Sequence, residues 1–212
     1  MCVCILCQRA DIAAAPLTIT ASRYRVVDFT VPFMADNLAI LVKKRHSTQF
    51  HIHSISDLGG QSTVKYGVLA AGATEDFFRN SRLALYRRMW AAMYREGNAS
   101  RVGTIREGIE RVLASSDEQP WAFVSESAAF KYVTARWRCD VEVIVDEYNP
   151  RYLSLAVPLG SNSLYRDLLS ITMLEMLESG EVNMLRTKWW YPLMDCENAL
   201  NDRAKRFHFP LQ

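Results

Sequence analysis

The amino-acid sequence predicts an α/β fold with largely parallel sheets. Short apolar runs of strand length alternate along the chain with longer segments whose apolar residues recur at helical spacing, which is the pattern of α/β proteins. Half of the 212 residues are apolar, enough to form a substantial core. No apolar run approaches the ~20 residues that a membrane-spanning helix needs. We therefore expect the chain as written to be soluble.

The expected elements follow one another in a regular order. Strands are expected at residues 12–15, 36–44, 64–69, 121–125, 141–145 and 153–157. Helices are expected at residues 22–27, 54–58, 73–78, 83–95, 104–113, 126–136, 163–177 and 182–190. The polar stretch 45–53 is expected to be a linker, and the tail from residue 198 shows no periodicity.

Several boundaries have a specific local cause. Pro16 is expected to end the first strand, and Thr18 or Thr20 is expected to cap the short helix that follows. The Gly59-Gly60 pair is expected to end the second helix. The segment 83–95 carries apolar residues at fourfold spacing, as one buried helix face requires: Leu85, Met89 and Met93.

The charges and cysteines narrow the classes of function. A net charge of +2 is weak, the short basic runs are expected to be solvated, and we expect no nucleic-acid partner. The N-terminal cysteines, Cys2, Cys4 and Cys7, have no His or Cys nearby to complete a metal site. A buried apolar strand, or a translation start that is not the native one, is therefore favoured over a metal centre. A bridge between Cys139 and Cys196 would indicate an oxidising compartment, as would a glycosylated Asn98 in its N-A-S sequon.

The most informative stretch is A-P-L-T-I-T-A-S-R at residues 15–23, followed by D-F-T-V-P-F-M at residues 28–34. Pro16 offers a carbonyl oxygen without an N–H group, and Thr18 offers a hydroxyl group. Arg23 offers a rigid fork of donors that matches a carboxylate. An acceptor, a hydroxyl and a cation so close together suit an α-amino acid, which carries an ammonium and a carboxylate on one carbon. The alternative is that these residues only cap a surface turn.

This stretch resembles the ligand-binding core of ionotropic glutamate receptors, of the AMPA and kainate kind. Further segments resemble the same family in the same order: residues 64–68, 72–78, 86–93, 107–109, 125–127 and 179–190. The resemblance extends from Ala10 to about Glu197, and Cys139 and Cys196 fall where the family places its disulfide. It implies a bilobed clamshell of the periplasmic-binding-protein type II kind. Lobe 1 would comprise residues 1–36 and 157–212, and lobe 2 residues 37–156.

The resemblance also implies a ligand site between the lobes. Arg23 would hold the α-carboxylate, while the Pro16 carbonyl, the Thr18 hydroxyl and Glu126 would accept from the ammonium. The start of the helix at Ala73 and Thr74 would offer N–H groups to a second carboxylate, which favours L-glutamate over glycine or serine. Without the resemblance, Glu126 would be an ordinary carboxylate at a helix N-terminus, and Thr74 an ordinary cap.

The implied function is an amino-acid-binding domain, or a fragment of one, of a ligand-gated cation channel that closes around its ligand to drive gating. The full-length receptor would be an oligomer, a tetramer in this family, in the plasma membrane with this domain outside the cell. No cofactor is expected. The family's lobe 1 begins upstream of Met1, its pore helices would lie between Lys44 and Ile52, and its last membrane helix would follow Cys196, so these parts are expected to be missing from this chain.

Two other functions are compatible with the sequence. A free soluble amino-acid-binding protein of the same fold would use the same pocket, but it would need an export signal that the sequence lacks. An enzyme of this fold is less favoured, because the candidate pocket contains no His and the sequence shows no Ser–His or metal-ligand spacing.

Overall fold

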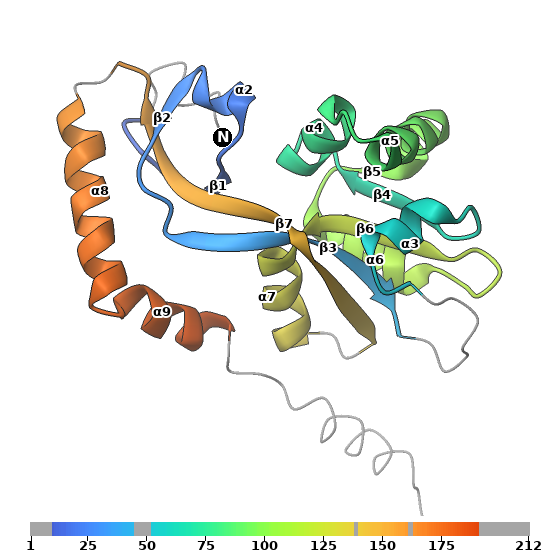
Figure 1. The fold of residues 1–212 in the computed structure, drawn as a ribbon. Coiled ribbons are helices and arrows are strands. Elements are labelled where there is room, and N and C mark those ends of the chain that lie inside the picture. The colour runs from blue at the N-terminus through green and yellow to red at the C-terminus, as the bar shows by residue number, and fades with distance from the viewer. Residues whose placement is uncertain (1–9, 45–51, 138–139, 161–162, 191–212) are drawn as a thin grey trace, which may run out of the picture.

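The computed structural model describes residues 10–44, 52–137, 140–160 and 163–190, and for residues 133–137 and 163–164 it describes the backbone alone (Figure 1). Within these ranges the chain forms one mixed sheet of seven strands in the order β1-β7-β3-β6-β4-β5, with β2 pairing with β7. The strands are β1 (Ala13–Thr18), β2 (Val27–Phe29), β3 (Met34–Lys43), β4 (Lys65–Leu69), β5 (Arg101–Val102), β6 (Trp121–Glu126) and β7 (Val141–Pro158).

The sheet is built around the two longest strands, β3 and β7. They pair antiparallel from Met34 opposite Leu153 to Lys43 opposite Val141, with a register shift between Asn37 and Leu38. Strands β1 and β2 pair with the C-terminal part of β7, whereas β6 pairs with the part of β3 beyond the shift. The two long strands therefore connect the end of the molecule that holds β1 and β2 to the end that holds β4, β5 and β6 (Figure 1).

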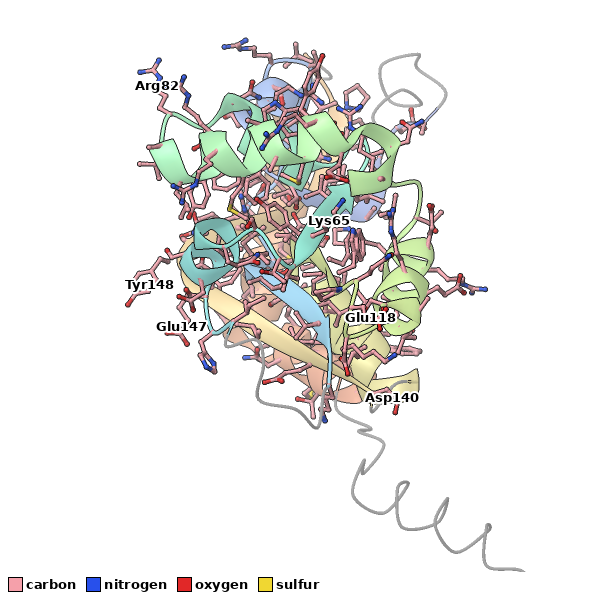
Figure 2. The ribbon with its side chains drawn as sticks, turned by 90° about the vertical axis from the view of Figure 1, so that its right-hand side faces the viewer. Lys65, Arg82, Glu118, Asp140, Glu147 and Tyr148 are labelled. Carbon is pink, nitrogen blue, oxygen red and sulfur yellow. The ribbon has the colours of Figure 1, made fainter. Side chains whose placement is uncertain are left out.

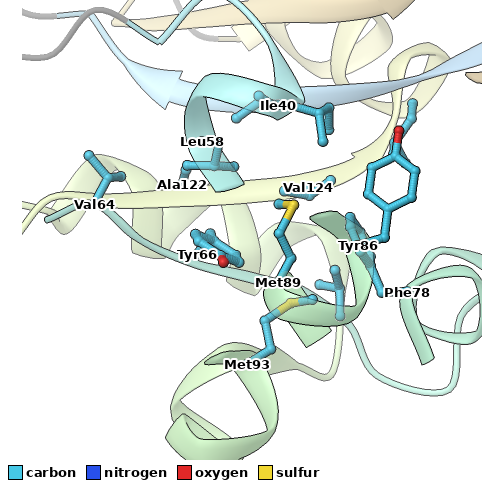
Figure 3. Packing of buried hydrophobic residues seen from close by; sticks show 13 residues of the cluster. Ile40, Leu58, Val64, Tyr66, Phe78, Tyr86, Met89, Met93, Ala122 and Val124 are labelled. Atoms are coloured by element: carbon cyan, nitrogen blue, oxygen red, sulfur yellow. The ribbon is translucent and has the colours of Figure 1, made fainter. Parts of the chain in front are cut away.

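Helices cover both faces of the sheet at the β4–β6 end. They are α3 (Ile55–Gly60), α4 (Ala73–Asn80), α5 (Ala84–Glu96), α6 (Ile105–Ala114) and α7 (Ser127–Trp137), with a short 3-10 helix at Gly97–Ser100. Leu38 and Ile40 of β3 face one buried cluster, with Leu58, Phe78 and Met89 among its helix residues (Figure 3). Ala39 and Leu41 face a second buried cluster on α6 and α7. Successive residues of β3 are buried on opposite faces, which explains its nearly continuous apolar sequence.

The β1–β2 end is covered less completely. Helix α2 (Ala21–Tyr24) lies beside β2 and α8 (Ser163–Glu178) lies at this end of the sheet, while α9 (Glu181–Trp190) runs from α8 toward α7 (Figure 1). None of the described side chains on α8 or α9 is buried, and the exposed apolar ones include Tyr165, Leu168, Ile171, Met184 and Trp189. Neither helix, nor any other helix in the described ranges, has the length and apolar character needed to cross a bilayer.

The mixed α/β architecture is as predicted, but the expectation of largely parallel sheets is wrong. Strand β4 is parallel to β5 and β6, while the described pairings of β1, β2, β3, β6 and β7 with one another are antiparallel. Alternation of strands and helices along the sequence does not by itself determine strand direction. Here the two longest strands, β3 and β7, pair antiparallel. The two strands expected at 141–145 and 153–157 are one continuous strand, β7.

Local differences from the prediction also have physical reasons. Strand β1 does not end at Pro16 but continues to Thr18, because Pro16 lies on an edge strand where the register shifts and no N–H group is needed. Thr20, not Thr18, caps the following helix, and that helix ends at Tyr24 before the unpredicted strand β2. By contrast, the Gly59-Gly60 pair ends α3 as expected, since Gly60 is its last residue. The predicted division into lobes at residues 36 and 157 stays a prediction.

The close approach of β4 to the Gly97–Ser100 turn can be tested at Gly67. A Cβ atom at Gly67 would lie 2.3 Å from the backbone carbonyl oxygen of Ser100 and 2.7 Å from the Trp121 ring. We expect Gly67→Ala to lower the free energy of unfolding by about 1–3 kcal/mol, the scale of overpacking. Urea titration followed by circular dichroism would measure this change.

The matched control is Gly60→Ala, since Gly60 has open space around it and lies in a helix. We expect this control to be neutral or to stabilise by up to about 1 kcal/mol, because alanine is the better helix former. Equal unfolding free energies for the two variants would contradict the close contact at Gly67.

Candidate functional site

The site begins where β1 ends and α2 starts. Thr18 is the last residue of β1 and its side chain is buried. Thr20 caps α2 by accepting a hydrogen bond from the Arg23 backbone N–H at 3.3 Å. This cap orients the helix so that Arg23 points back toward the strand, where its Nη1 donates to the Thr18 carbonyl oxygen at 3.0 Å.

A long-range contact joins this segment to β6. The Thr18 hydroxyl donates a hydrogen bond to Oε1 of Glu126, the last residue of β6, although 108 positions separate the two residues in the sequence. Strands β7 and β3 lie between β1 and β6 in the sheet. The structure therefore brings together three of the predicted site residues, Thr18, Arg23 and Glu126, from opposite sides of the two long strands.

Glu126 is a partly buried carboxylate with cations nearby. Burial raises the pKa of Glu126, and the neighbouring Asp36 raises it further. The hydrogen bond from Thr18, together with the positive charges of Arg151 and Arg23, acts in the opposite direction and limits the rise of this pKa. The net effect is a raised pKa, so the ionised carboxylate of Glu126 is less stable here than in water. A cationic group bound beside Glu126 would stabilise this ionised form.

Asp36 is a site residue that the sequence did not indicate. Its buried carboxylate accepts hydrogen bonds from the Ser127 hydroxyl and from the backbone N–H groups of Ala128 at 2.9 Å and Asn37 at 2.8 Å. Asp36 thus holds the N-terminus of α7 and fixes the residue immediately after Glu126. The available signal was an acid near the start of a mainly apolar strand.

Arg151 is the second residue that sequence reasoning missed. It lies on β7 opposite Asp36, and its guanidinium carbon is 4.2 Å from the centre of the Phe77 ring. Burial lowers the pKa of Arg151, while the charges of Glu126 and Tyr86 act to raise it. Its Nη2 atom is buried and has no hydrogen-bond partner. A cation in the middle of a half-buried strand was the available signal.

These residues lie on four neighbouring strands of the sheet. Thr18 is on β1, Arg151 on β7, Asp36 on β3 and Glu126 on β6, and the sheet order is β1-β7-β3-β6. Arg151 is directly opposite Asp36, and Leu153, two residues further along β7, is opposite Thr18. The cluster therefore crosses the sheet along one band, and it exists only when all four strands are paired.

The start of α4 and Pro16 are less directly connected to this cluster. Ala73 and Thr74 open α4 and are buried, with Gly72 as a cap that supplies no side-chain hydrogen bond. The next residue, Glu75, accepts from the Ala71 backbone N–H at 2.5 Å and pairs with Arg79 and Arg101. Pro16 is exposed on β1. The contacts described for these ranges do not join Ala73, Thr74 or Pro16 to Glu126.

The cysteines and the glycosylation sequon are the other residues that the sequence singled out, and the structure describes only some of them. All five cysteines, including Cys139 and Cys196, lie outside the described residues, so the disulfide stays a prediction. Asn98 is exposed in the 3-10 helix Gly97–Ser100, and its glycosylation also stays a prediction. Within the described ranges, no group of three His, Cys, Asp or Glu side chains is arranged to hold a metal ion.

Comparison with known proteins bears out the family resemblance. Residues 1–46 match the family model described as "Ligated ion channel L-glutamate- and glycine-binding site". These findings make the chain a relative of the ionotropic glutamate receptors. Within that family it is similar to "Glutamate receptor ionotropic, kainate 1" of Rattus norvegicus and of Homo sapiens, each 34% identical over 139 residues. The match covers 66% of this chain, and the chain spans about 14% of the length of these curated relatives.

The raised pKa of Glu126 predicts a specific dependence of stability on pH. Because this pKa is higher in the folded than in the unfolded chain, the ionised carboxylate costs stability above its folded pKa, and protonation relieves that cost as the pH falls. We expect Glu126→Gln, which keeps an acceptor for Thr18, to stabilise the chain at pH 7.5 by on the order of 1 kcal/mol. The gain should shrink as the pH is lowered through the folded pKa.

The measurement is urea unfolding of both proteins at a series of pH values from 7.5 down to 5. A matched control is Glu118→Gln, since Glu118 lies exposed on the surface shown in Figure 2. The control should change stability little at any pH. A Glu126→Gln variant that is less stable than the wild type at pH 7.5 would show that the buried charge is stabilising, contrary to this assignment.

Proposed function

We propose that this chain is an amino-acid-binding domain, or part of one, of a ligand-gated cation channel, with L-glutamate as the favoured ligand. The observation that carries the proposal is the convergence of Thr18, Arg23 and Glu126 from β1, α2 and β6. This set combines a forked cation, a hydroxyl and a carboxylate at one place. It matches the two charged groups on the α-carbon of an amino acid. The similarity to the kainate receptors supports the same proposal.

Each residue has a distinct role in the proposed complex. Arg23 binds the α-carboxylate with its two terminal nitrogens, exchanging its contact with the Thr18 carbonyl for the stronger charged pair. Glu126 and the Thr18 hydroxyl bind the ammonium together with the Pro16 carbonyl. Because the pKa of Glu126 is raised by burial, an ammonium beside it restores the stability of its ionised form. Ala73 and Thr74, at the start of α4, offer donors to the second carboxylate of glutamate.

In the proposed clamshell, residues 1–36 and 157–212 belong to lobe 1, and residues 37–156 form lobe 2. Two features support this division. The register of β3 and β7 shifts between Asn37 and Leu38, and a small buried cluster on β1, β2 and β7 is separate from the two larger clusters. A ligand held by Arg23 on one side and Glu126 on the other favours the closed form by its differential affinity. In the full-length receptor this closure would drive gating.

The proposal extends to the context of the full-length protein. We propose that the receptor is an oligomer, a tetramer, in the plasma membrane, with this domain outside the cell. A disulfide between Cys139 and Cys196 and a glycan on Asn98 suit that oxidising compartment. A free amino-acid-binding protein of the same fold would use the same cluster, and the similarity to named channel receptors favours the receptor. The same similarity favours binding without catalysis.

Arg23→Lys tests the role of the guanidinium fork. Lysine keeps the positive charge but cannot form two parallel hydrogen bonds to one carboxylate. Calorimetric titration of the full chain with L-glutamate should show binding weakened by at least about 2 kcal/mol. Arg25→Lys, an exposed change two positions along, is the matched control. Unchanged glutamate affinity in Arg23→Lys would refute the assignment of Arg23.

The choice of ligand provides another test of the proposed pocket. Glycine would satisfy Arg23 and Glu126 but would leave the donors at Ala73 and Thr74 without a carboxylate. It should therefore bind more weakly than glutamate by about 1.5–3 kcal/mol, the scale of one charge-assisted contact. Glu126→Asp should shorten the reach to the ammonium and shift preference toward smaller amino acids.

Competition among glutamate, aspartate, glycine and serine on the wild type and on Glu126→Asp measures both effects. If glycine or serine displaces glutamate more effectively on the wild type, the pocket is not selective for glutamate, although the amino-acid-binding role would stand.

A further inference from the structure

One partly buried cation near the site, Arg151, has no role in the function proposed above. Nη2 of Arg151 is buried and lacks a hydrogen-bond partner, and it is the sole buried side-chain nitrogen or oxygen in this condition among the described residues. A buried donor without a partner costs free energy, and a charged one costs more than a neutral one. Such a group calls for an acceptor that the protein itself does not supply.

The neighbouring acids do not supply this acceptor. Asp36 lies directly opposite Arg151 in the sheet, so their side chains share a face, but its carboxylate is occupied by Ser127, Ala128 and Asn37. Glu126 accepts from Thr18. The ion pairs found within the described ranges include none between Arg151 and either acid. Arg151 therefore lies close enough to Glu126 to influence its charge without pairing with it.

Aromatic contacts hold the Arg151 guanidinium beside α4. Its carbon lies 4.2 Å from the centre of the Phe77 ring, and this ring packs against Tyr86 at 4.9 Å between centroids. Phe77 is one helical turn after Ala73, so the two residues share a face of α4. Arg151 therefore contacts the face of α4 that also carries the first residue of the helix, and its charge acts on Glu126.

We propose that Arg151 binds the second carboxylate of an acidic amino acid and makes the site selective for dicarboxylic ligands. The inference rests on the proposed amino-acid-binding function and adds a specificity-determining residue to it. Such a ligand carries two carboxylates and one ammonium. The site offers two guanidinium groups, Arg23 and Arg151, and two carboxylates, of which Asp36 is already engaged by Ser127 and Ala128, which leaves Glu126 for the ammonium. A carboxylate at this position gives Nη2 the acceptor that it lacks.

The test compares L-glutamate with L-glutamine, which has nearly the same shape but carries a neutral amide in place of the second carboxylate. Calorimetric titration of the full chain would measure both ligands on the wild type, Arg151→Gln and Arg151→Lys. In Arg151→Gln we expect glutamate affinity to fall about tenfold to a hundredfold, with glutamine affinity changed less than about threefold. Arg151→Lys keeps the charge but loses the fork, so the loss for glutamate should be intermediate.

The matched control is Arg82→Gln, which removes an exposed arginine on the surface seen in Figure 2. It should leave the affinities for both ligands unchanged. Thermal unfolding of each variant shows whether it is folded. If Arg151→Gln does not fold, the glutamate and glutamine affinities of Arg151→Lys test the inference.

The outcomes separate this inference from the proposed function. Equal weakening of glutamate and glutamine in both Arg151 variants would mean that Arg151 acts only through Glu126, and it would overturn the inference. Unchanged affinity for both ligands would also overturn it, while binding of either ligand by the wild type would leave the proposed function standing. Binding of neither ligand by the wild type would overturn both.

Discussion

The antiparallel pairing of β3 with β7 is the constraint on which the rest of the structure depends. Strands β1 and β2 attach to β7, and β6 attaches to β3, so this pair aligns both ends of the molecule (Figure 1). The candidate site lies across it, with one residue on each of four adjacent strands: Thr18, Arg151, Asp36 and Glu126. A slip of one strand of this pair by one residue would place Asp36 and Arg151 on opposite faces of the sheet and destroy the cluster.

The site concentrates charged groups where a purely structural sheet would place apolar ones. Asp36 is fully engaged, because the start of α7 supplies donors to its carboxylate. The desolvation of the Glu126 carboxylate is only partly compensated, since burial raises its pKa in spite of the hydrogen bond from Thr18. Arg151 retains a buried donor without an acceptor. Incomplete compensation lowers the stability of the chain, and it leaves groups ready to bind a ligand of complementary charge.

The comparisons and the geometry inform different parts of the site. The family model matches residues 1–46, which include Thr18, Arg23 and Asp36 but neither Glu126 nor Arg151. The latter two come from β6 and β7, and the folded sheet brings them to the same place. The match to the kainate receptors covers 66% of the chain, a larger share than the family model covers.

The sequence by itself determined the elements whose causes are local. The expected strands at residues 36–44, 64–69 and 121–125 and the helices at 83–95 and 104–113 agree with β3, β4, β6, α5 and α6 to within one or two residues, because period and caps act over a few positions. The sequence also indicated Thr18 and Arg23 through their spacing, and Glu126 through the family resemblance. Tertiary structure decided the strand directions, the continuity of β7 and the roles of Asp36 and Arg151. Each of these depends on pairing between residues about a hundred positions apart, which no local pattern encodes.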